Sequence, residues 1–93
     1  MKTIWKYELK FEEKFQIEMP VKAIVRYVAL DEKTNKPCIW VELEPSTTTQ
    51  EYHFELFGTG HEIHSNMGVE RIYLGSYQYQ NGEFIGHLYQ RIN

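Results

Sequence analysis

The sequence has few of the residues on which several classes of protein depend. It contains one cysteine, Cys38, so no disulfide can form within the chain, which is typical of a protein of the reducing cytoplasm. It has 10 Lys and Arg against 13 Asp and Glu, and the basic residues form no cluster. A binder of duplex nucleic acid normally carries a basic patch or stripe, so we expect no such partner.

Long apolar runs are absent as well. No segment approaches the roughly 18 apolar residues of a membrane span, and the start, residues 1–7, mixes charged with aromatic residues in place of an apolar signal region. We therefore expect no membrane partner and a cytoplasmic location. No window repeats apolar residues at helical spacing, so the pattern predicts no confident helix.

Aromatic residues are plentiful at 15% of the 93 residues. This length corresponds to a single domain over residues 1–93. A chain this short buries only about 60 to 65% of its unfolded surface. Because Tyr and Trp are enriched at protein interfaces, we expect a homo-oligomer.

Seven segments are strand-like, and several of them alternate between apolar and polar residues, as half-buried strands do. They span residues 3–10, 15–20, 22–30, 38–44, 51–57, 69–79 and 83–90. The pattern predicts an all-β fold, a small antiparallel β-sandwich or barrel of about seven strands. Residues 22–30 are apolar on both faces, which predicts a central strand.

Asn81-Gly82 predicts a type I′ hairpin, because both central residues of that turn need a positive φ. The turn sets the register of the last two strands. The expected pairs are Tyr79 with Phe84, Tyr77 with Gly86 and Ser76 with His87. Simple alternation along residues 69–79 places Ile72 and Leu74 on the face opposite to Tyr73, Tyr77 and Tyr79.

The segment from Phe54 to Ser65 changes character most sharply. A strand-like run ends at Gly58-Thr59-Gly60 and opens into a loop that holds two of the four histidines. Two glycines permit positive φ and close approach, so their amides would form an anion-binding nest. The hypothesis is a phosphate-bearing ligand. The ligand-binding residues would be Gly58, Thr59, Gly60, His61, His87 and Arg71.

Two alternatives stay open for this loop. In the first, the glycines only turn the chain and His61 packs on a neighbouring tyrosine. In the second, His61 and His64 bind Zn²⁺, although a pair on a loop lacks the fixed geometry of a helical H-E-x-x-H motif. We expect no resident metal and no cofactor. Cys38 lies in an apolar run and is interpreted as a small buried hydrophobe.

Several motifs along nearly the whole chain resemble a family of short uncharacterised bacteriophage and prophage proteins. They are Ile4-Trp5-Lys6-Tyr7-Glu8-Leu9, Ile17-Glu18-Met19-Pro20, Pro37-Cys38-Ile39-Trp40, Phe57-Gly58-Thr59-Gly60-His61, Tyr73-Leu74-Gly75-Ser76-Tyr77-Gln78 and Gly86-His87-Leu88. The sequence departs from the family pattern at Glu62, where proline is usual. The resemblance implies a phage or prophage origin, and hence the cytoplasm of a bacterial host.

Three functions follow as hypotheses. The first is a non-enzymatic anti-defence protein that sequesters a phosphate-bearing nucleotide signal. The second is an inhibitor or structural accessory that docks on a host protein through an aromatic and acidic surface. The third is a small nucleotide hydrolase that uses His61 with Thr59 or His64, which the chain supports least because it shows no activated nucleophile and no cofactor signature.

Overall fold

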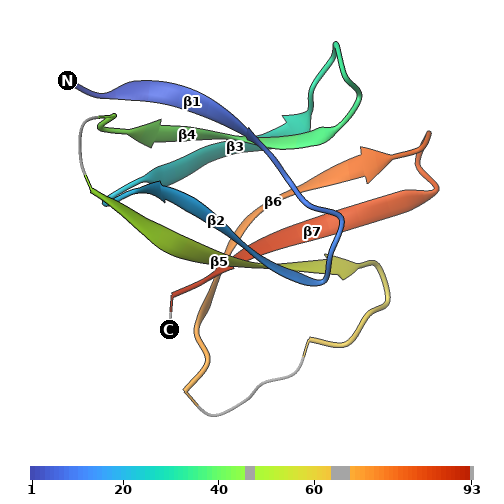
Figure 1. The fold of residues 1–93 in the computed structure, drawn as a ribbon. Coiled ribbons are helices and arrows are strands. Elements are labelled where there is room, and N and C mark those ends of the chain that lie inside the picture. Colours follow the sequence, from blue (N-terminus) through green and yellow to red (C-terminus); the bar gives the residue numbers. More distant parts are fainter. Residues whose placement is uncertain (46–47, 64–67, 93) are drawn as a thin grey trace.

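The computed structural model describes residues 1–45, 48–63 and 68–92, and the regular structure in them is all β-strand (Figure 1). The strands form two antiparallel sheets, one of three strands in the order β1-β4-β3 and one of four in the order β2-β5-β7-β6. The predicted all-β sandwich of about seven strands is confirmed. The strands are β1 (Thr3–Glu8), β2 (Lys14–Pro20), β3 (Ile24–Leu30), β4 (Pro37–Leu43), β5 (Thr49–Gly58), β6 (Arg71–Tyr79) and β7 (Phe84–Arg91).

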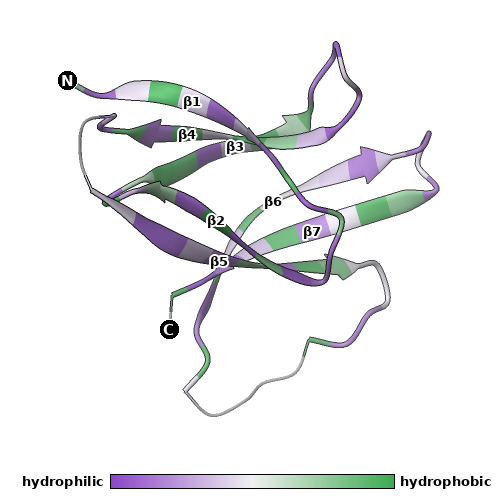
Figure 2. Ribbon diagram, viewed as in Figure 1, coloured by the Kyte–Doolittle hydropathy of each residue, from purple (hydrophilic) through white to green (hydrophobic). Residues whose placement is uncertain are grey.

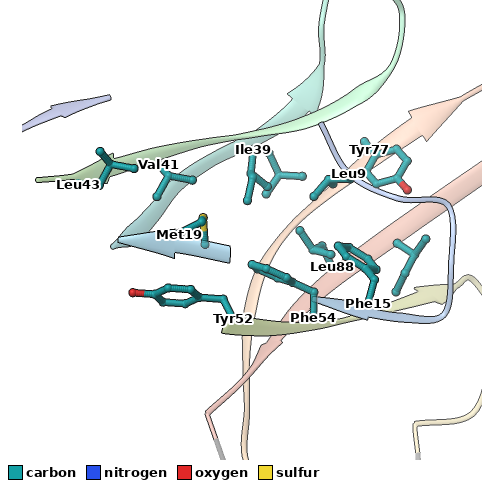
Figure 3. Close-up of a cluster of buried hydrophobic side chains, with 12 residues drawn as sticks. Leu9, Phe15, Met19, Ile39, Val41, Leu43, Tyr52, Phe54, Tyr77 and Leu88 are labelled. Atoms are coloured by element: carbon teal, nitrogen blue, oxygen red, sulfur yellow. The ribbon is translucent and has the colours of Figure 1, made fainter. Parts of the chain in front are cut away.

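The core lies between the two sheets (Figure 3). Strand β4, in the middle of its sheet, places Ile39, Val41 and Leu43 inward, each at most 1% exposed. Phe54 and Leu88 come from the two central strands of the other sheet and are buried as deeply. Figure 2 shows hydrophilic and hydrophobic residues mixed along the strands, since alternate side chains point to opposite faces of a sheet. Each sheet therefore has one buried and one outer face.

The hairpin between β6 and β7 has the predicted geometry. Asn81 and Gly82 have φ of 56° and 87°, and the amide of Glu83 donates to the carbonyl of Gln80 at 3.1 Å. These are the features of a type I′ turn. The register follows from it, and the pairs Tyr79 with Phe84, Tyr77 with Gly86 and Ser76 with His87 are all confirmed.

The prediction that Tyr73, Tyr77 and Tyr79 share one face is wrong. The register of β6 shifts between Tyr73 and Gly75, and such a bulge moves the residues on its two sides to opposite faces. Tyr77 points into the core and is 5% exposed, whereas Tyr73 lies on the outer face and is 55% exposed. The bulge thus delivers an aromatic ring to the outer surface.

The prediction of a central strand over residues 22–30 is also wrong. Strand β3 is at the edge of its sheet, and Ile24 and Tyr27 are 43% and 60% exposed. Packing against β6 of the other sheet accounts for the apolar character of its inner face only. There a Cβ built on Gly75 would lie 3.0 Å from the Cβ of Val28.

This close approach gives a testable prediction. Gly75→Ala is expected to lower the free energy of unfolding by about 1–3 kcal/mol, the usual cost of overpacking. Val28→Ala removes Cγ2, one of the two Val28 atoms that would lie 3.0 Å from the new methyl group, and leaves the other, Cβ. The double variant should therefore be more stable than the sum of the two single effects, as measured by urea unfolding. Additive effects would show that the two strands have room to separate.

Tyr77 generates a second prediction. Its hydroxyl is buried and has no hydrogen-bond partner among the described residues, and burial raises the pKa of Tyr77 to about 12. An unfolded tyrosine ionises near pH ~10. The stability that depends on neutral Tyr77 is therefore complete below pH ~10 and is lost as the pH rises from there through about 12.

The variant to compare is Tyr77→Phe. At neutral pH it is expected to match or exceed the parent by up to about 1 kcal/mol, because an unpaired buried hydroxyl is removed. Above pH ~10 it should lose less stability than the parent, by an amount on the order of 2 kcal/mol. An equal loss of stability above pH ~10 in Tyr77→Phe and in the parent would show that the raised pKa does not belong to Tyr77.

Candidate functional site

The loop after β5 is closed by His61. The ring nitrogen Nδ1 of His61 accepts a hydrogen bond from the amide of Gly58 at 3.0 Å, and the amide of His61 donates to the carbonyl of Gly58 at 3.0 Å. A Cβ on Gly58 would lie 2.9 Å from His61 Cε1, so the imidazole can lie on the backbone only because residue 58 is glycine. In the neutral ring, this bond leaves the proton on Nε2.

A row of four polar side chains crosses the outer face of the four-stranded sheet. We name it the hydroxyl–imidazole row: Thr59, His87, Ser76 and Tyr73. His87 Nε2 lies 3.0 Å from Thr59 Oγ1, His87 Nδ1 lies 2.8 Å from Ser76 Oγ, and Ser76 Oγ lies 2.6 Å from Tyr73 OH. Both ring nitrogens of His87 are thus held by hydroxyl groups, which fixes the plane of the ring.

The row has two self-consistent proton arrangements when the imidazole is neutral. If Nδ1 accepts from Ser76, then Nε2 donates to Thr59, and the Thr59 hydroxyl keeps its own proton to donate elsewhere. If the direction is reversed, the spare proton belongs to Tyr73. One end of the row is therefore always a donor and the other an acceptor, and a bound molecule can select the direction.

Aromatic rings flank the row on the same face. Phe57 meets Tyr89 edge to face, with ring centroids 5.6 Å apart, and Tyr89 meets Tyr73 at 5.4 Å. At the other end of this series the guanidinium of Arg71 lies over the ring of Phe57, 5.8 Å from its centroid. These contacts hold the exposed ring of Tyr73 and the charge of Arg71 in one continuous surface.

A buried carboxylate anchors the basic end of this surface. Glu55 is 3% exposed although it lies on the outer face of β5, because the surrounding side chains cover it. Arg71 Nε donates to Glu55 Oε2 at 3.2 Å, and Arg91 Nε lies 3.4 Å from Oε1 as an ion pair. Hydrogen bonds to charged groups are stronger than neutral ones. We call these three residues the Glu55 cluster.

A hollow of about 430 Å³ opens between the Glu55 cluster and the loop after β5. His61 and Arg71 both line it, together with Phe57 near the end of β5. Thr59, Gly58 and His61 line a second hollow. His61 therefore lines both hollows. The structure thus places the predicted residues Gly58, Thr59, Gly60 and His61 in one turn, with His87 bonded to it and Arg71 across the first hollow.

The amide of Gly58 donates to His61, so an anion at this turn would be met by the side chains of the loop and the row rather than by that amide. The metal hypothesis finds no support in residues 1–45, 48–63 and 68–92, where no group of three or more His, Cys, Asp or Glu could hold an ion. His64 lies outside the described residues. Among those same residues there is no helix of the length and apolarity needed to cross a membrane.

Cys38 is buried at 2% exposure, and this burial raises the pKa of its thiol. The interpretation of Cys38 as a small buried hydrophobe is confirmed. Sequence reasoning missed Ser76, Phe57 and Glu55 as members of the surface. The signal for Ser76 was available, because the Asn81-Gly82 turn already paired it with His87.

The fold and this surface define a small antiparallel β-sandwich with a polar and aromatic outer face. The whole chain, residues 1–93, matches the model of a family described as a domain of unknown function (DUF7352), and the protein belongs to that family. Comparisons with curated proteins and with solved structures find no match.

The Glu55 cluster gives a prediction about stability. Glu55→Gln leaves two guanidinium groups beside a buried neutral amide, and breaking a buried ion pair on one side costs roughly 3–5 kcal/mol. We expect a loss at the lower end of this range, because Arg91 keeps about a third of its surface in solvent. Glu51→Gln, an exposed site on the same strand, should stay within about 0.5 kcal/mol of the parent. Equal losses of stability in the Glu55 and Glu51 variants, measured by urea unfolding, would show that the ion pairs of Glu55 do not stabilise the fold.

Proposed function

We propose that this protein is a non-enzymatic binding module that holds a phosphate-bearing nucleotide on the outer face of its four-stranded sheet. The observation that carries the proposal is the hydroxyl–imidazole row, lying beside exposed aromatic rings. Ligand sites commonly combine apolar or aromatic surface with a few fixed polar groups that orient the ligand. Here the polar groups are bonded to one another, so their positions are set before a ligand arrives.

The parts of a nucleotide correspond to parts of this surface. A base would stack on Tyr73, whose ring is 55% exposed and is supported from the side by Tyr89. The ribose hydroxyls would exchange hydrogen bonds with the two ends of the row. The phosphate would lie toward Thr59 and His61. Arg71 is across the first hollow, whose lining also includes the carboxylates of Glu13, Glu55 and Glu62.

The biological part of the proposal comes from the resemblance to bacteriophage and prophage proteins. A phage protein that binds a nucleotide tightly without converting it would remove a signal from a bacterial defence system. Binding of this kind is stoichiometric and shows no turnover. A nucleotide recovered unchanged from heat-denatured complex is the expected result, and product in that sample would support the hydrolase in its place.

The binding test is a thermal-unfolding scan against linear and cyclic nucleotides, with inorganic phosphate as a separate sample. A ligand at about 100 times its Kd stabilises the folded state by about 2.7 kcal/mol, which raises the Tm of a domain this size by roughly 10 °C or more. We expect a shift of that order with one nucleotide. A flat panel would contradict the proposal.

Variants then locate the site. Tyr73→Ala removes the proposed base platform and should weaken binding by about 1–3 kcal/mol, the usual value of a stacked base. Tyr27→Ala is the matched control, since Tyr27 is equally exposed, at 60%, but lies on the other sheet. His61→Ala should also weaken binding, whereas His53→Ala, on β5 but away from the loop, should not. Equal binding by the His61 variant and the parent would place the phosphate elsewhere.

One observation favours a second candidate, a module that docks on another protein. The outer face of the three-stranded sheet exposes Ile4, Ile24 and Tyr27 at 51%, 43% and 60%, and Trp40 packs against Tyr27 with ring centroids 5.4 Å apart. Ile4 and Ile24 lie on either side of Glu42, and exposed apolar groups rimmed by polar residues often mark a protein interface. This candidate predicts no response to nucleotides and loss of partner binding in Tyr27→Ala.

A further inference from the structure

Strand β1 has an edge that is not paired within the described residues. Its backbone is hydrogen-bonded to β4 on one side only, and Figure 1 shows it at the outer border of its sheet. The amide of Leu9 donates to the carbonyl of Pro37 at 2.9 Å, which makes this residue pair a hydrogen-bonded one. Because such pairs alternate along an antiparallel ladder, the even-numbered residues of β1 direct their N–H and C=O groups away from β4.

The side chains of those residues also face solvent. Lys2, Ile4, Lys6 and Glu8 all lie on the outer face and are exposed. Trp5 lies between them on the inner face, yet it remains 43% exposed. The edge therefore offers free backbone groups together with a large uncovered ring, and an edge of this kind is a template for another strand.

The possible partners include a second copy of β1, and the sequence can be tested for self-complementarity. In an antiparallel pair with a twofold axis perpendicular to the sheet, each face maps onto itself. One residue therefore lies directly opposite its own copy, and the axis passes midway between the two. An axis at Trp5 places Lys2 opposite Glu8 of the second copy and Ile4 opposite Lys6. Lys2 and Glu8, which also pair with Glu42 and Lys36 of their own chain, then face each other at both ends of the pair. The two Trp5 rings meet at the axis.

The neighbouring registers are less favourable. An axis at Ile4 places Lys2 opposite Lys6, and an axis at Lys6 places that lysine opposite its own copy. Directly opposed like charges destabilise a strand pair, whereas opposed unlike charges stabilise it. With the axis at Trp5, all even-numbered residues from Lys2 to Glu8 also form hydrogen-bonded pairs, and the Trp5 pair falls at a position where side chains approach most closely.

The other exposed edge provides a contrast. Strand β2 pairs with β5 only. The amide of Leu56 donates to the carbonyl of Glu13 at 2.9 Å, so the even-numbered residues of β2 direct their backbone N–H and C=O groups away from β5. Those positions end in Pro20, which has no N–H to donate and protects an edge from pairing. The edge of β1 contains no proline.

We propose that two copies of this protein associate through β1, with Trp5 on the twofold axis, to form one continuous six-stranded sheet in the order β3-β4-β1-β1-β4-β3. The interface uses the three-stranded sheets, so the hydroxyl–imidazole row on the four-stranded sheets stays exposed in both copies. The proposal is therefore independent of the proposed nucleotide binding, and either can fail alone.

A charge exchange tests the register. Lys2→Glu and Glu8→Lys should each weaken dimerisation roughly tenfold or more, because each converts two attractive pairs into two repulsive ones. The double variant Lys2→Glu/Glu8→Lys restores unlike charges and should recover most of the affinity. Sedimentation equilibrium measures the Kd, and far-ultraviolet circular dichroism confirms that each variant is folded.

Hydrogen exchange tests the backbone pairing in the unmodified protein. On raising the concentration through the dimer Kd, the amides of Ile4, Lys6 and Glu8 should become protected, while those of Gln16 and Glu18 on the edge of β2 should not. In a Trp40→Phe background, the emission of Trp5 should shift to the blue over the same range.

Three results would overturn the proposal. One is a monomer at all concentrations up to about 1 mM, where even weak specific pairing is populated. Another is a dimer that the single charge variants leave unchanged. The third is a double variant no tighter than the single variants, since that would place the axis away from Trp5.

Discussion

The burial of one carboxylate, Glu55, constrains the outer face of β5, β6 and β7 in the four-stranded sheet. A buried charge must be paired, and Glu55 is paired with Arg71 at the start of β6 and with Arg91 at the end of β7. Arg71 lies over Phe57, and from Phe57 the ring contacts continue to Tyr73 and on to the hydroxyl–imidazole row. One ionic cluster thus positions a surface that spans three strands.

The fold could be predicted from the sequence wherever a local rule acts alone. Alternation gives the seven strands, and the Asn81-Gly82 turn gives the register of β6 against β7. The failures come from contacts between segments far apart in the chain. The bulge after Tyr73 reverses the faces of β6, and the inner face of the edge strand β3 is buried where Gly75 of the other sheet approaches Val28. Periodicity alone contains no information on either contact.

The candidate site was predicted in part for the same reason. The segment from Gly58 to His61 is a local turn, and its residues stand together in the structure as they do in the sequence. Ser76 joins them only through the ladder to His87, and Glu55 only through arginines on two other strands. A polar residue on an alternating strand is ordinarily interpreted as a solvated side chain, so the burial of Glu55 could not be expected from its position.

The most direct test of the account is an amide chemical-shift map of the labelled protein, recorded with the nucleotide that gives the largest thermal shift. If the hydroxyl–imidazole row binds the ligand, the largest changes will fall on the loop after β5 and on the outer face of β6 and β7, at Thr59, His61, Ser76 and His87. Changes confined to β1, β3 and β4 would contradict it, because they would show that the ligand binds the opposite sheet and that the hydroxyl–imidazole row has no part in recognition.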